Sequence, residues 1–233
     1  MAHEAMADAK MSKNLASMTA ALLILTTLVE VLAILHHPHV QDRDHLHETL
    51  EIIAVSPLAG WIHGLAIGCS LLTAYCLGEV LMKRIPGSLI RLAALVYAVG
   101  IVGWITAATV DGWVLERLAG SLAHDTPADL ESNARLFKMC MAWVVASTNV
   151  GVVLTSVGIF IASAGLLWNG RSWKIAGTLG LLVGAALSFS VVAGRLTMDG
   201  HGIIMAVGLQ GLWFVSLGIV SLITPDNVVE GVN

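Results

Sequence analysis

Six long apolar stretches constrain this sequence more than any other feature. A helix needs about 20 predominantly apolar residues to cross the hydrocarbon core of a bilayer. Of the 233 residues 57% are hydrophobic and 12% are charged, and soluble domains carry roughly twice that charged share. Disordered chains, disulfide scaffolds and soluble enzymes are therefore excluded. The stretches cover residues 15–35, 58–81, 89–110, 137–167, 175–193 and 203–223.

These stretches predict an all-α integral membrane protein, a bundle of six transmembrane helices that forms a single domain over residues 1–233. They are too long for strands and lack the alternation that a membrane barrel requires. All 5 prolines fall at or beyond the predicted helix ends, where a proline does least harm. The stretch 137–167 exceeds what a bilayer requires, so we expect it to be tilted or to extend past the membrane.

The distribution of Lys and Arg predicts the orientation. Cytoplasmic loops are enriched in these residues, and a cytoplasmic N-terminus puts the majority on short inner loops: Lys10, Lys13, Lys83, Arg84, Arg91, Arg171 and Lys174. Six spans then place both termini in the cytoplasm. The compact loops favour a prokaryotic inner membrane. The net charge of −4 and the lack of a clustered basic face argue against nucleic acid as a partner.

Histidines gather on one side of this predicted bundle. Of the 9 histidines, only His3 lies on the inner side; the others map to the outer loops or the outer halves of spans. The loop after the first span is the densest part, with His36, His37, His39, His45 and His47 close to three acidic residues. Such a loop is either a solvated polar connection or a collector of metal ions.

Ionisable groups inside the spans are the sharper signal. Each costs roughly 2.5–3.5 kcal/mol at the centre of a span, so it is a functional hypothesis by default. Glu30 and His37 are two helical turns apart and point the same way. We expect their helix and three others to converge at similar depth and to supply metal ligands: Glu30, His37, His63, Asp111 and His201. Secondary ligand candidates are His36, His39, His45, His47 and Asp199.

Imidazoles and carboxylates together suit copper, iron or zinc. The glycines that follow His63 and His201 also leave room for a porphyrin face, so the two histidines are alternatively the axial ligands of haem b. A third interpretation is a hydrogen-bonded polar cluster without an ion. The inner half of the bundle is almost purely apolar apart from Glu79, and a channel needs polar lining through its full depth. We therefore expect a site open to one face only.

Three functions follow as alternatives. The first is a membrane metalloprotein with its site near the outer or periplasmic face, an oxidoreductase acting on a lipid-soluble substrate such as a quinone or hydrocarbon. The second is a carrier or chaperone for copper or zinc with the His-rich loop as its collector. The third is an accessory subunit of a larger membrane complex, or a homo-oligomer, whose polar cluster is structural. No catalytic residue is assigned from the sequence.

Overall fold

The computed structural model describes residues 2–37, 59–122, 127–198 and 200–224, and all regular secondary structure in these residues is helical. The elements are α1 (Ala2–Leu35), α3 (Ala59–Met82), α4 (Gly87–Thr109), the π-helix η1 (Val110–Leu115), α5 (Glu116–Leu122), α6 (Pro127–Leu166), α7 (Arg171–Val192) and α8 (Gly200–Ile223).

Six helical segments of the described residues are long and apolar enough to cross a membrane. The predicted fold class is confirmed to that extent, and two helices run beyond the apolar stretches predicted as spans. The helix of the third stretch continues past residue 110 through η1 and α5 to Leu122. The helix of the fourth begins at Pro127, ten residues before the predicted stretch, and is 40 residues long, although its membrane-length apolar part begins at Ala134. Hydropathy marks where a helix can sit in lipid, whereas polar residues extend these two helices further.

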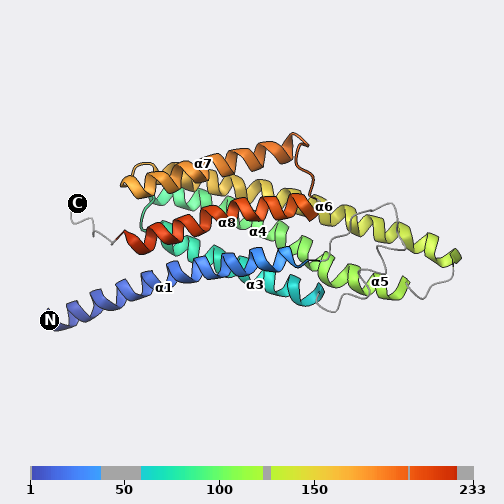
Figure 1. Cartoon of the computed structure of the whole chain (residues 1–233), viewed down its shortest axis with the longest axis horizontal. Helices are drawn as coiled ribbons and strands as arrows, with labels where there is room; N and C mark the ends of the chain where they lie inside the picture. Colours follow the sequence, from blue (N-terminus) through green and yellow to red (C-terminus); the bar gives the residue numbers. More distant parts are fainter. Residues whose placement is uncertain (1, 38–58, 123–126, 199, 225–233) are drawn as a thin grey trace.

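The six long helices form a closed ring (Figure 1). Each packs against the next one along the chain, and α8 packs against α1 to complete the circle. The start of α1 and the end of α8 lie at the same end of the bundle, which we call the terminal end. From the opposite end α5 and the first part of α6 project beyond the other helices, so that α6 does extend past the bundle as its length suggested.

Glycine brings α4 and α6 into backbone contact. A Cβ atom built at Gly100 would lie 2.6 Å from the backbone nitrogen of Thr155, and one at Gly103 would lie 2.9 Å from that of Gly151. Such distances are too short for any side chain. This close approach supplies van der Waals contact between the two backbones, the kind of contact that holds helix pairs together in lipid.

An apolar core fills the half of the bundle nearer the terminal end. Its members come from all six helices, and it includes Leu23, Cys76, Ile159, Trp173 and Trp213. The ring of Trp213 is fully buried, and its Nε1–H donates to the carbonyl of Ala176 at 3.0 Å. The candidate polar site described below lies in the other half of the bundle, away from the terminal end.

Candidate metal centre

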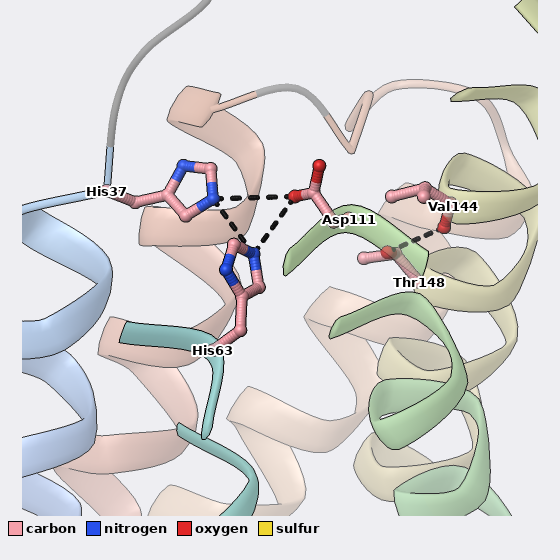
Figure 2. Close-up of polar contacts among 5 residues, drawn as sticks. All are labelled: His37, His63, Asp111, Val144 and Thr148. Carbon is pink, nitrogen blue, oxygen red and sulfur yellow. Dashed lines mark hydrogen bonds and ion pairs between the residues drawn. The ribbon is translucent and has the colours of Figure 1, made fainter. Parts of the chain in front are cut away.

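Three side chains from separate segments meet at the end of the bundle opposite the terminal end (Figure 2). His37 Nε2 lies 3.1 Å from His63 Nε2, and Asp111 Oδ2 lies 3.2 Å from His63 Nε2 and 3.4 Å from His37 Nε2. These three atoms form the one group of potential metal ligands found in the described residues. The structure therefore places two imidazoles and one carboxylate around a common point.

The end of α1 places His37. The last helical residue is Leu35, and the N–H of His37 still donates to the carbonyl of Ile34 at 3.1 Å. The following proline disfavours helical backbone angles at His37. The side chain consequently leaves the helix axis at its end and turns toward α3, as Figure 2 shows.

Gly112 fixes the ring of His63. A Cβ atom at position 112 would lie 2.5 Å from both Cβ and Cγ of His63, so the ring packs directly on the backbone of η1. Only 7% of His63 is exposed. This contact holds the imidazole in place without a hydrogen bond from Gly112, and only a glycine permits it.

The π-helix η1 presents Asp111. Where α4 passes into η1, the N–H of Val110 is shared between the carbonyls of Thr106 and Ala107. A π-helical turn holds more residues than an α-helical turn and turns side chains to directions that a regular helix would not give. Such turns are rare and are found often at functional sites. Asp111 occupies the first turn of this segment, and its carboxylate faces both histidines.

The separations fit a bound ion. Three atoms 3.1–3.4 Å apart lie about 1.9 Å from their common centre, and zinc–imidazole and zinc–carboxylate bonds measure about 2.0–2.2 Å. An ion slightly above the plane of the three atoms would contact all of them without movement of the protein. The side chains of His37 and Asp111 are 29% and 26% exposed, so that an ion can reach the group from outside.

The same three atoms lie within hydrogen-bond distance of one another, so a proton-linked cluster is one arrangement of this site. Each imidazole Nε2 carries at most one proton. With both Nε2 atoms unprotonated and the carboxylate ionised, all three atoms are electron-pair donors, which is the form that a cation would bind.

The remaining sequence-based ligand candidates lie elsewhere. The structure does not bring Glu30 or His201 into the ligand group. Glu30 lies deeper in the bundle, where Ser70 Oγ donates to its Oε1 at 2.6 Å. His201 is exposed, because the start of α8 turns Gly200 and Ile203 toward the site instead. The ring of the exposed His36 contacts the carbonyl of Leu32 in its own helix at 2.8 Å. His39, His45, His47 and Asp199 lie outside the described residues.

A cavity of about 90 Å³ connects the ligand group with Glu30. Its walls are mainly apolar and include Ile34, Ile67 and Ile105, while its two ends are polar. Thr148 also lines it, but its hydroxyl donates to the carbonyl of Val144 at 2.8 Å (Figure 2). The site thus combines an exposed polar end with an apolar chamber behind it, which we call the inner cavity.

Two residues of this site escaped the sequence analysis. Gly112 directly follows Asp111, but no sequence pattern indicates that a histidine ring packs on it. Ser70 follows His63 at the same seven-residue spacing that separates Glu30 from His37, so this matched spacing could have predicted a pair two turns below the histidines.

Comparison of the chain with models of protein families, with curated proteins and with solved structures found no match.

Proposed function

We propose that this chain is an integral membrane protein that binds one transition-metal ion through His37 Nε2, His63 Nε2 and Asp111 Oδ2. The observation that carries the proposal is the convergence of these three atoms within 3.1–3.4 Å of one another. The six apolar helices support a place in the bilayer. The distribution of Lys and Arg supports cytoplasmic termini and a site near the outer face of a prokaryotic inner membrane.

The donor set favours iron or zinc. Two histidines and one carboxylate with open positions are typical of non-haem iron(II) oxygenases, and a similar set holds catalytic zinc. Copper sites with soft ligands use thiolates or thioethers, and Cys140 is not a member of the ligand group. Haem b fits less well, since the neighbouring donor atoms occupy the space at His63 Nε2 that a porphyrin would require.

The inner cavity supports redox chemistry on a small apolar group. Three protein ligands leave coordination positions open for water or substrate, and the isoleucine-rich wall of the inner cavity would accept a hydrocarbon portion. We therefore favour an oxidoreductase that acts on a lipid-soluble substrate. In this proposal Asp111 also neutralises part of the charge of the ion, which lowers the cost of holding it within the bundle.

Elemental analysis of the gently solubilised full chain tests this proposal. We expect about one equivalent of iron or zinc per chain, the number that a single three-ligand site holds. His63→Ala and Asp111→Asn should each lower the affinity for that ion by more than about 100-fold, the upper range for loss of a residue that only supports a ligand. His36→Ala is the matched control, because this neighbouring histidine lies outside the ligand group.

Protein that was never exposed to chelator, yet contains metal far below one equivalent and takes up none on dialysis, contradicts the proposal. Loss of metal in His36→Ala but not in His63→Ala would also contradict it. That result would locate binding in the His-rich loop and favour the carrier hypothesis.

A further inference from the structure

Polar side chains pair in register along the interface between α1 and α3. These helices run antiparallel, and three pairs follow one another from the ligand group inward. His37 contacts His63 at 3.1 Å, Glu30 accepts from Ser70 at 2.6 Å, and the hydroxyls of Thr26 and Thr73 are 2.9 Å apart. The first two pairs are seven residues apart on both helices, which is about 10 Å along each axis. We call this row of three pairs (His37–His63, Glu30–Ser70 and Thr26–Thr73) the seam. Glu30 thus lies on the same seam as the metal ligands, two turns deeper.

In the described part of the chain, Glu30 has one hydrogen-bond partner, Ser70, and it borders two cavities. The inner cavity separates it from the ligand group, and a smaller cavity of about 20 Å³ lies on its other side, against Tyr97 and Gln210. Cys69 and Tyr97 are the nearby titratable groups. Among the described residues, no Lys or Arg lines either cavity. An ionised carboxylate without a countercharge is expensive at this depth, so a proton is the readiest compensation.

The inner cavity provides a path between Glu30 and the ligand group. It has room for several water molecules, and a water in a cavity requires polar partners. His37, His63 and Asp111 supply such partners at one end, and Glu30 with Ser70 supplies them at the other. A short chain of water would therefore find hydrogen bonds at both of its ends.

The seam ends below the third pair. Past Thr26 and Thr73 the next residues on the same interface are the buried Leu23 and Cys76, which belong to the apolar core. Among the described residues, the seam thus has no further polar pair below Thr26 and Thr73. The ligand group is its exposed end, so we expect proton exchange with the outside to occur there.

We propose that Glu30 is the proton-exchange group of the metal centre. Glu30 holds a proton while the centre is empty and releases it through the inner cavity when a divalent ion binds, because the ion about 10 Å away then favours the carboxylate. With the ion bound, the Glu30 carboxylate would be available to take up a proton delivered through the inner cavity during a reaction at the centre. This inference rests on the proposed metal site and gives Glu30 a role other than ligation.

Infrared difference spectroscopy of the solubilised full chain, with zinc minus without zinc, tests the inference. We expect zinc to remove the C=O stretch of a protonated carboxyl, a band that shifts in D₂O and is missing in Glu30→Gln. In weak buffer, the wild type should also release about one more proton per zinc ion than Glu30→Gln, since metal binding releases the protons of coupled groups. Glu79→Gln is the matched control, a carboxylate of the neighbouring helix α3 that lines neither cavity.

Ser70→Ala gives a second, milder variant. Loss of the 2.6 Å hydrogen bond to Glu30 Oε1 should move the carboxyl band to higher frequency without abolishing it. An unshifted band in Ser70→Ala would assign the signal to another carboxyl and overturn the inference, even if Glu30→Gln does not fold.

The outcomes separate this inference from the metal site itself. If Glu30→Gln binds zinc and releases as many protons as the wild type, the inference fails and the metal site stands. If folded Glu30→Gln binds no zinc, Glu30 is a ligand and the inference fails in that direction. If the wild type binds neither zinc nor iron(II), the proposed function fails and the role of Glu30 fails with it.

Discussion

Two antiparallel helix pairs of the same ring are held together in different ways. Between α4 and α6, glycines let the backbones touch, and a Cβ at Gly100 would lie 2.6 Å from the nitrogen of Thr155. Between α1 and α3, side chains meet in hydrogen-bonded pairs and the inner cavity opens beside them. Where backbones touch, as between α4 and α6, no space for a ligand remains between the helices. Where side chains are paired, as between α1 and α3, a cavity can open beside them. The α4–α6 pair is thus suited to be a rigid support, and the α1–α3 pair is suited to carry a binding site.

Asp111 connects the α4–α6 pair with the α1–α3 pair. It lies in η1, which continues directly from α4, so the glycine-packed α4–α6 pair sets its position. Packing of Leu115 and Ala119 against Phe137 of α6 fixes the segment on its other side. A carboxylate on a fixed frame thus faces two histidines on the helix pair that lines one side of the inner cavity. Selective damage to either pair should therefore have different consequences.

The largest effect is expected from Gly100→Ala, which forces the backbones of α4 and α6 apart. Overpacking of this kind costs about 1–3 kcal/mol, and we expect the upper end because the obstructing atom belongs to the backbone. Unfolding by SDS in mixed micelles measures the change. Gly78→Ala is the control, since a Cβ there meets nothing within 4 Å, and it should be neutral or stabilising by about 0.5–1 kcal/mol. Equal losses in both variants would contradict the proposed contrast.

Gly112→Ala should damage the site while sparing the fold. Its Cβ would lie 2.5 Å from the ring of His63 and would push the imidazole out of line. Loss of a residue that orients a ligand costs about 10–100-fold in metal affinity, which a zinc competition titration measures. Gly120→Ala, in the adjoining α5, meets nothing within 4 Å and should bind as the wild type does. Unchanged affinity in Gly112→Ala would show that the ring of His63 is not held by η1.

The smallest effect concerns the third pair of the seam. Thr26 and Thr73 share a hydrogen bond of 2.9 Å, and such bonds between membrane helices average about 0.6 kcal/mol. A double-mutant cycle of Thr26→Val and Thr73→Val, followed by SDS unfolding, should give a coupling of about that size. Thr178, which is exposed and bonds only its own helix, replaces Thr73 in the control cycle. In the control cycle the coupling energy should be zero. Equal coupling energies in both cycles would show that Thr26 and Thr73 do not interact specifically.

The sequence was sufficient to predict the number and approximate place of the membrane-length helices, but it did not predict where two of these helices end. Apolar stretches of 20 or more residues identify membrane-length helices because few other structures satisfy their backbone in lipid. The extensions through α5 and into the first part of α6 are polar, so hydropathy carried no information about them. Nothing in the sequence indicated η1 either, since a π-turn has no compositional signature comparable to a cap or a proline.

The sequence predicted how deep in the bundle each site residue lies, but it did not predict which way each side chain points. Hydropathy placed His37, His63, Asp111 and His201 at similar depth, and the first three do meet. Whether a side chain faces inward depends on the rotation of its helix. On α8 that rotation is set by packing against α1 and α7, and it turns Gly200 and Ile203 inward while His201 is left exposed.

The π-turn at Val110–Leu115 suggests how such a site could arise and disappear. A π-turn differs from an α-helix by one inserted residue, and each residue of an α-helix adds about 100° of rotation. Removal of one codon within this segment would restore a continuous helix from α4 to α5 and turn Asp111 or its successors away from the histidines. In a protein whose α4 continues regularly into α5, insertion of one residue at this point would thus be enough to turn the Asp111 carboxylate toward the two histidines. Among relatives, a gap of one residue at this point should divide chains that bind the ion from chains that do not.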